Sequence, residues 1–488
     1  MSVSAKRRAF VTPPTSPSKR PPSVASSLSE REALPPPAAV VASTAVEPSH
    51  AEVESKQYAE ERKPLGPEPI YKWYDALSSA LFYIVSYAYS FLFVRFFTFY
   101  ATLCVFAPWY CLYHIAEWPT RIGALLGFGC GGPTDAREKE GEVEFQPGSF
   151  ARTPENHFKD LPEYNFDPNY FTFKGLRVHY VDLGPKEGAR ETLVFLHGNP
   201  TWSFMFRKVM WQLSENFRVL AVDMIGFGKS DKLLFEPHSI SLQVQMFAFF
   251  VRHLNLKDIT LVLHDWGGQI GLSALDEINT EGFLKNLVLI DTFLLGRVDL
   301  HHEIDLAASL LLATFQMCTS MLGRHTPLYP IIRFIAPHTP TSIVKGYRAP
   351  YPDSATRAVM ETFPRLIHPY LPIHLTPLLA TLFPELNESM KSDDDIHRRN
   401  MAIRKRLKTF GHPVLIVYGK TDQISSYFRL KWRHLLPGDA LKRTGGRIVI
   451  VTDAGHLVPE DDANTLSDVM HDWLEGKEIE YSDKVHFL

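Results

Sequence analysis

The chain has 488 residues, which is more than one ordinary domain needs and enough to bury a large core. Its formal net charge of −3 at neutral pH argues against nucleic acid or another strongly charged partner. The four cysteines are too few for a disulfide framework and lack the spacing of metal ligands, so no metal site is expected.

The N-terminal 68 residues are rich in Pro, Ser, Ala and Glu and contain almost no aromatic side chains. A segment of this composition cannot bury enough apolar surface to offset the conformational entropy lost on folding. We therefore predict that residues 1–68 form a disordered tail.

A hydrophobic segment follows at residues 70–118. Residues 76–94 carry no formal charge, and after Arg95 a second uncharged run covers residues 96–113. The first run approaches the ~20 residues that cross a bilayer. This predicts a membrane-associated localisation through a single span or a hairpin, with the side of the following domain left open. The alternative is a pair of helices packed on that domain. Residues 119–153 are predicted to be a linker.

From residue 154 onward, strand patterns alternate with helical patterns, which is typical of an α/β fold with a mostly parallel sheet flanked by helices. The rhythm stops at residues 294–407, where short helical patterns predict an inserted helical lid, or cap. The core is accordingly expected at residues 154–293 and 408–480. The pattern predicts a hairpin at 171–183, strands at 192–196, 217–222, 284–290, 414–418 and 447–451, and helices at 241–254 and 463–474.

The stretch at residues 261–268 is typical of a sharp turn between a strand and a helix. An apolar run ends at Asp265, and Gly267 and Gly268 follow before a helical pattern begins. We expect the glycines to let the backbone turn and the helix pack closely. Such a turn exposes one side chain, and a carboxylate in that place is a nucleophile for saturated carbon or a strained ring. The simpler alternative is that Asp265 is a helix N-cap.

A carboxylate nucleophile needs a base that activates water against its ester and an acid that orients the base. Asp422 comes just after a late predicted strand, and His456 lies on the loop after the last one. Their order along the chain, nucleophile, acid and histidine, is that of the α/β-hydrolases.

Four short sequences resemble those of the haloalkane dehalogenases, over about residues 155–478 with the cap included. They read His-Gly-Asn-Pro-Thr-Trp-Ser at 197–203, His-Asp-Trp-Gly-Gly at 264–268, Gly-Tyr-Arg-Ala-Pro-Tyr-Pro-Asp at 346–353 and Phe-Pro-Arg-Leu-Ile at 363–367.

The resemblance implies a role for each site residue. It makes Asp265 the nucleophile that displaces halide and forms an alkyl ester, and His456 the base that activates water. Asp422 is the acid that holds the base, with Asp291, at the end of the strand after the turn, as the alternative. Trp266 and Asn199 would bind the leaving halide through side-chain N–H groups, and their backbone N–H groups would form the oxyanion hole. Asn199 as a plain turn residue and Trp266 as core packing are the alternatives.

The expected reaction is therefore cofactor-free hydrolysis of a carbon–halogen bond in a small apolar organic substrate. One alternative is an epoxide hydrolase, which uses the same Asp nucleophile and needs cap tyrosines as acids; the candidates are Tyr329, Tyr347, Tyr351 and Tyr370. Another is a binding module without catalysis, against which the complete set of three residues argues.

Overall fold

A computed structural model describes residues 144–235, 238–278, 282–294, 319, 322–366, 396 and 398–488. The predicted disordered tail (residues 1–68), the hydrophobic segment (70–118) and most of the predicted linker lie outside the described residues, as do large parts of the predicted cap.

The predicted membrane localisation has to be corrected. In the described part of the chain, no helix is long and apolar enough to cross a bilayer. This finding overturns the predicted membrane-associated localisation. The uncharged runs that prompted it, 76–94 and 96–113, lie outside the described residues. A lack of charge is also a weak criterion, because seven of the 19 residues in the first run are Ser or Tyr.

Nine strands of the described chain form one sheet in the order β11-β10-β9-β8-β7-β4-β5-β3-β2. The six strands from β10 to β5 run parallel, whereas β2 with β3, β3 with β5, and β10 with β11 pair antiparallel. The strands are β2 (Asn169–Phe173), β3 (Leu176–Leu183), β4 (Thr192–Leu196), β5 (Arg218–Val222), β7 (Ile259–His264), β8 (Leu284–Ile290), β9 (Val414–Gly419), β10 (Val449–Val451) and β11 (Val485–Phe487). This is the predicted α/β-hydrolase fold.

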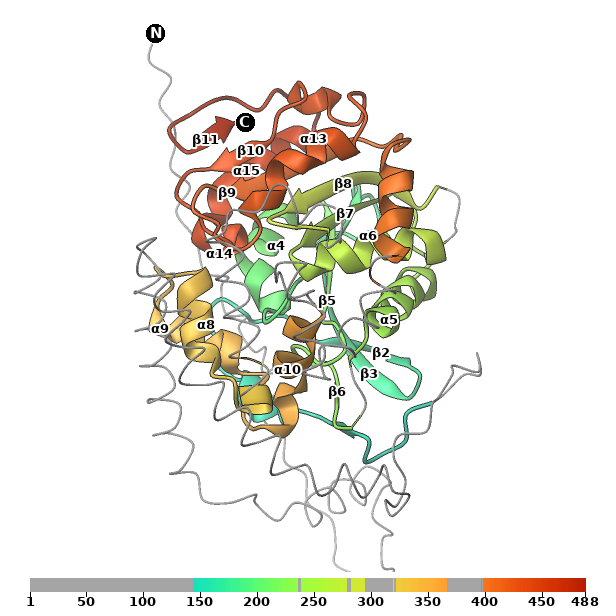
Figure 1. Ribbon diagram of the computed structural model, residues 1–488, viewed down its shortest axis with the longest axis vertical. Helices are drawn as coiled ribbons and strands as arrows, with labels where there is room; N and C mark the ends of the chain where they lie inside the picture. Colours follow the sequence, from blue (N-terminus) through green and yellow to red (C-terminus); the bar gives the residue numbers. More distant parts are fainter. Residues whose placement is uncertain are drawn as a thin grey trace, which may run out of the picture. The chain divides into compact units, whose positions relative to one another are not determined.

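Helices flank the sheet and connect its parallel strands (Figure 1). The described α-helices are α4 (Arg207–Leu213), α5 (Ile240–His253), α6 (Trp266–Ile278), α8 (Leu328–Ile335), α9 (Thr341–Arg348), α10 (Ala358–Arg365), α13 (Trp432–Leu435), α14 (Val458–Asp461) and α15 (Ala463–Leu474). Short 3-10 helices are η1 (Glu155–Phe158), η2 (Ser203–Phe206), η3 (Gly323–His325), η4 (Ala355–Arg357), η5 (Ser426–Lys431) and η6 (Lys442–Thr444). The strand β1 (Phe150–Ala151) pairs with β6 (Lys232–Leu233).

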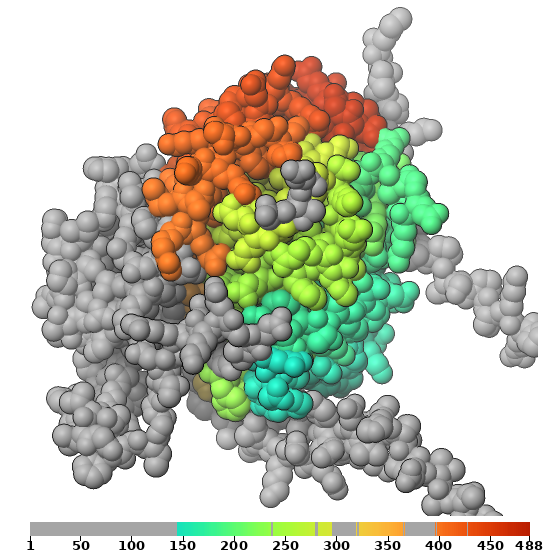
Figure 2. All heavy atoms as spheres, turned by 90° about the vertical axis from the view of Figure 1, so that its right-hand side faces the viewer, coloured from blue at the N-terminus to red at the C-terminus, as the bar shows by residue number. Residues whose placement is uncertain are grey.

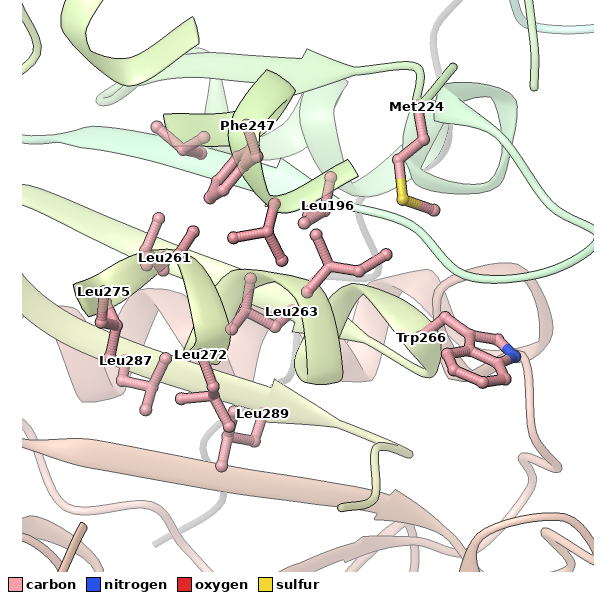
Figure 3. Packing of buried hydrophobic residues seen from close by; sticks show 14 of the residues in the cluster. Leu196, Met224, Phe247, Leu261, Leu263, Trp266, Leu272, Leu275, Leu287 and Leu289 are labelled. Carbon is pink, nitrogen blue, oxygen red and sulfur yellow. The ribbon is translucent and has the colours of Figure 1, made fainter. Parts of the chain in front are cut away.

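The central strands are mostly apolar because both of their faces are buried. Alternate residues of β7 enter opposite layers: Leu261 and Leu263 pack in the cluster with α5 and α6, whereas Val262 joins the cluster with α4 and α15. Figure 3 shows the first layer, in which leucines of β7, α6 and β8 interlock below Phe247 of α5. Each fully buried leucine contributes about 2 kcal/mol to folding.

The predicted elements match the observed ones closely where the pattern is strong. The hairpin and the predicted strands are all present, and the last helix has the predicted bounds. The strands β1, β6 and β11 were not predicted, because two or three residues are too few to display the two-residue period of a strand.

The strand order brings the ends of five strands together. Because β10, β9, β8, β7 and β4 are neighbours and parallel, the loops that follow them emerge at the same edge of the sheet. On the face seen in Figure 2, residues around 240–290 (yellow-green) lie between the N-terminal part of the core (cyan to green) and its C-terminal part (orange to red). Every predicted site residue follows one of these five strands.

The described part of the cap contacts the core through polar groups. The indole N–H of Trp202 donates to the carbonyl oxygen of Gly346 in α9 at 3.2 Å. The hydroxyl of Tyr347, also in α9, donates to Glu460 of α14 at 2.8 Å. Glu460 in turn pairs with the buried Arg207 of α4 at 2.6 Å. These contacts join α9 to the segment that follows His456.

Candidate active site

Asp265 occupies a strained turn between β7 and α6. Its φ is +51°, in the left-handed region that side chains other than glycine rarely adopt. The turn is thus made by Asp265 itself, whereas Gly267 and Gly268 already belong to α6. A Cβ on Gly267 would lie 2.2 Å from the carbonyl oxygen of Leu196, and one on Gly268 would lie 1.7 Å from Thr292 Oγ1. The glycines therefore allow close packing, as predicted, but do not form the turn.

The Asp265 carboxylate is buried and held by groups from two other loops. The backbone N–H of Asn199, after β4, donates to Oδ1 at 3.0 Å. On the other side, His456 Nε2 lies 3.3 Å from Oδ2. Thr292 fixes the turn beneath, since its hydroxyl donates to the backbone carbonyl of Asp265 at 2.7 Å. The carboxylate thus has one oxygen on a backbone donor and the other facing an imidazole.

His456 lies between two carboxylates. Its Nδ1 is 3.0 Å from Asp422 Oδ1, and its Nε2 faces Asp265. Asp422 also accepts hydrogen bonds from the backbone N–H groups of Ile424 at 2.8 Å and Ser425 at 3.1 Å, and from the Ser425 hydroxyl. The structure therefore brings Asp265, His456 and Asp422 together.

The charges of this group depend on one another. Burial opposes a charge on Asp422, but the His456 ring and the surrounding donors outweigh it and lower the pKa of Asp422. Burial likewise opposes a charge on His456, and the carboxylates of Asp422 and Asp265 outweigh it and raise the pKa of His456 well above its ordinary value. An ionised acid and a readily protonated histidine result.

Asp291 lies outside this group. It follows β8, is fully buried, and accepts a hydrogen bond from the backbone N–H of Gly419 at 2.9 Å. Its Oδ2 has no partner among the described residues, and neither oxygen lies within 4.0 Å of a His456 nitrogen. Burial, reinforced by the charge of Asp422, raises the pKa of Asp291 well above its ordinary value. The surroundings of Asp291 therefore disfavour its ionised form, whereas those of Asp422 favour it.

Trp266 and Asn199 each have a side-chain polar atom that makes no hydrogen bond with the described residues. The indoles of Trp202 and Trp432 donate to protein oxygens, whereas that of Trp266 donates to none in the described ranges. Figure 3 shows its nitrogen at the end of the ring, beyond the leucines. Likewise, the buried Asn199 Oδ1 has no partner there. The rings of Phe293 and Phe363 pack against the Trp266 ring in edge-to-face contacts, with ring centroids 5.7 and 5.3 Å apart, respectively.

The cap tyrosines named for the epoxide alternative are engaged elsewhere or lie outside the description. The hydroxyl of Tyr347 donates to Glu460, and that of Tyr351 to the carbonyl oxygen of Pro200 at 3.5 Å. Tyr329 accepts a hydrogen bond from Arg333 at 3.4 Å. Tyr370 lies outside the described residues. No described cap tyrosine makes a hydrogen bond with Asp265.

Three groups near the site received no role from the sequence. Thr292 supports the turn, His264 contacts the backbone of His456 at 2.8 Å, and Asp461 accepts a hydrogen bond from the backbone N–H of Gly455 at 2.9 Å. His264 and Thr292 each stand next to a predicted site residue at a strand end, a position that could have marked them. Asp461 gives no such signal, because its partner is a backbone group.

Known proteins with similar sequences share this architecture. A family model described as "alpha/beta hydrolase fold" matches residues 191–322. The haloalkane dehalogenase 1 of Mycobacterium tuberculosis is 31% identical over 347 residues, covering 67% of this chain and 98% of that protein. A haloalkane dehalogenase of Mycolicibacterium paratuberculosis is 29% identical over 344 residues, with 67% and 98% covered. Among solved structures, that of a haloalkane dehalogenase from Paraglaciecola agarilytica superposes with a TM-score of 0.52 at 23% identity, covering 66% of this chain and 97% of that one.

Proposed function

The chain belongs to the haloalkane dehalogenase family and is a hydrolase, and we propose that Asp265, His456 and Asp422 are the residues that cleave the carbon–halogen bond of a small organic halide. The observation that carries this proposal is the Asp265 carboxylate, buried on a strained turn between a backbone donor and the imidazole of His456.

In the first step, a carboxylate oxygen of Asp265 attacks the carbon that bears the halogen. A carbon–oxygen bond forms, the carbon–halogen bond breaks, and the electron pair leaves with the halide. The uncommitted N–H of Trp266 and the side-chain amide of Asn199 are suited to receive the halide, since neutral donors stabilise an anion without neutralising the nucleophile. The aromatic rings around Trp266 provide an apolar wall, which fits an apolar substrate.

In the second step, water attacks the ester carbonyl carbon and His456 accepts its proton. Forming the neutral ester removes one of the two negative charges that raise the pKa of His456. The ring then becomes able to give up its proton and act as a base at the stage that needs one. The N–H of Asn199, 3.0 Å from Oδ1, is placed to stabilise the oxyanion. Collapse releases the alcohol and restores Asp265.

Asp422 is the acid that orients His456 in this proposal. It is ionised and bonded to Nδ1, so that Nε2 points toward Asp265. The surroundings of Asp291 disfavour its ionised form, and among the described residues it makes no ion pair with the His456 ring, which supports Asp422 over the alternative. The commitment of Tyr347 and Tyr351 to other acceptors argues against epoxide opening.

The direct test measures halide release by the full chain from a panel of bromo- and chloroalkanes, with the isosteric Asp265→Asn variant as control. We expect release that is lost in the control. In His456→Phe, the first step continues and the second stops, so mass spectrometry should find one alkyl group on the peptide that contains Asp265. Halide release by the Asp265→Asn variant, or a His456→Phe protein that turns over substrate without added mass, contradicts the proposal.

A further inference from the structure

His264, the last residue of β7, connects the nucleophile strand directly to the backbone of His456. Its imidazole is buried, with Nε2 2.8 Å from the carbonyl oxygen of His456 and ring centroids 5.0 Å apart. A carbonyl oxygen only accepts hydrogen bonds, so Nε2 carries the proton and donates. Two consecutive residues of the chain therefore contact His456. Asp265 contacts the imidazole ring of His456, and His264 contacts its backbone carbonyl.

The loop between β10 and α14, residues 452–457, is called the histidine loop below, and three of its contacts hold the backbone of three consecutive residues, 454–456. Thr421 donates to the carbonyl oxygen of Ala454 from its backbone N–H, at 3.1 Å. Asp461 accepts from the N–H of Gly455 at 2.9 Å. His264 holds the carbonyl of His456 itself. Of these three, the His264 contact is the one that comes from the strand bearing the nucleophile, so it fixes the base relative to Asp265.

We propose that His264 is a positioning residue that holds the backbone of His456 so that its Nε2 faces the ester formed on Asp265. The inference rests on the proposed function. It assigns His264 to the second step alone, because attack of Asp265 on the substrate needs no base. A loosened histidine loop should leave ester formation intact and slow the attack of water, which needs Nε2 at hydrogen-bonding distance.

The imidazole ring of His264 must also stay uncharged for the positioning role. Burial, together with the nearby charge of His456, lowers the pKa of His264 to about 4. At neutral pH the ring is therefore a neutral donor. A cation at this place, 5.0 Å from the His456 ring, would oppose the proton that His456 takes from water.

Rapid-quench measurements with 1-bromobutane separate the two steps in the full chain. For His264→Leu we expect a burst of about one bromide per active site at the wild-type rate, followed by ester hydrolysis slowed about 10- to 100-fold, as for the loss of one buried hydrogen bond. Mass spectrometry should then find the butyl ester accumulated on Asp265. His264→Gln keeps an N–H donor at the end of its side chain and should restore hydrolysis to within about threefold.

A matched control is His238→Leu, which removes an equally buried imidazole that makes no hydrogen bond to the histidine loop among the described residues. Its hydrolysis rate should equal that of the wild type. If both steps slow equally in His264→Leu, or if the Gln variant is as slow as the Leu variant, the positioning role is overturned. If the wild type releases no halide from 1-bromobutane or from any bromo- or chloroalkane of the panel, both the proposed function and the positioning role are overturned. An active wild type beside an unaffected Leu variant overturns the positioning role alone.

Discussion

Asp422 and Asp291 are buried carboxyl groups at the ends of neighbouring parallel strands, yet their pKa values are shifted in opposite directions. Asp422 receives hydrogen bonds from two backbone N–H groups, a hydroxyl and the His456 ring, and its pKa is lowered against the effect of burial. Asp291 receives one, from Gly419, and burial raises its pKa well above the ordinary value. The number of donors around a buried carboxyl, more than its depth, decides whether it can serve as the partner of a charged histidine.

The largest effect is expected from Asp422→Asn. The substitution keeps the shape but removes the charge that stabilises the protonated ring and the acceptor that fixes its orientation. We expect kcat to fall about 10³- to 10⁴-fold, as in other enzymes with an acid–histidine pair, with the alkyl ester accumulating on Asp265. Steady-state halide release and mass spectrometry check both outcomes.

The control for this experiment is the wild-type protein, treated with substrate and analysed by the same two measurements. More than a tenth of the wild-type kcat in the Asn variant would make Asp422 dispensable and return Asp291 to consideration as the acid.

The opposite result is expected from Asp291→Asn. Because the surroundings of Asp291 favour its uncharged form, the neutral amide is a close replacement, and its oxygen still accepts from the N–H of Gly419. We expect activity within about tenfold of the wild type, as for a change that leaves buried hydrogen bonding intact.

The pH dependence of stability follows from the same shift. A carboxyl group whose pKa is raised by folding stabilises the folded state at low pH. This contribution is lost as the pH rises, because the same carboxyl group ionises at a lower pH in the unfolded chain. Asp291→Asn should therefore become more stable than the wild type as the pH increases, in urea unfolding at pH 5 and pH 8. Equal pH profiles would mean that Asp291 is ionised in the folded protein.

The sequence singled out the main residues of the candidate site because each follows a strand whose apolar run is easily recognised. Asp265, Asp422 and His456 could be placed in this way, and the parallel order of β7, β9 and β10 then brought them together. What the sequence left open was the choice between Asp422 and Asp291, since both follow strands. That choice depends on donors such as Ser425, whose distance from a carboxylate is set by the fold and not by a pattern.

The sequence was least informative where a contact involves backbone groups. The bond of His264 to the carbonyl of His456, and that of Asp461 to the N–H of Gly455, join residues whose side chains suggest no partnership. The membrane prediction failed for another reason, since it equated a run without charges with an apolar helix. Ser and Tyr are uncharged but remain polar.

A third carboxyl, Asp461, sharpens the comparison and should give the smallest effect. Like Asp291, it accepts one hydrogen bond from a backbone N–H among the described residues, here that of Gly455 at 2.9 Å. Burial, reinforced by the charge of Glu460, raises its pKa to about 6. Its contribution to stability is complete below about pH 4 and is lost as the pH rises through 6, where the folded protein must hold a buried charge. Asp461→Asn keeps the acceptor for Gly455 and stays neutral.

We therefore expect Asp461→Asn to match the wild type near pH 4 and to exceed its unfolding free energy by about 3 kcal/mol at pH 8, since the pKa rises from 3.8 to about 6 and each pKa unit corresponds to about 1.36 kcal/mol. Urea unfolding at the two pH values measures the difference. The control is Asp453→Asn in the histidine loop that precedes α14; its side chain is 66% exposed, so the variant should give no such trend. A difference between Asp461→Asn and the wild type that stays constant across the range would show that folding leaves the pKa of Asp461 unchanged, and that one backbone donor suffices to offset the effect of its partial burial.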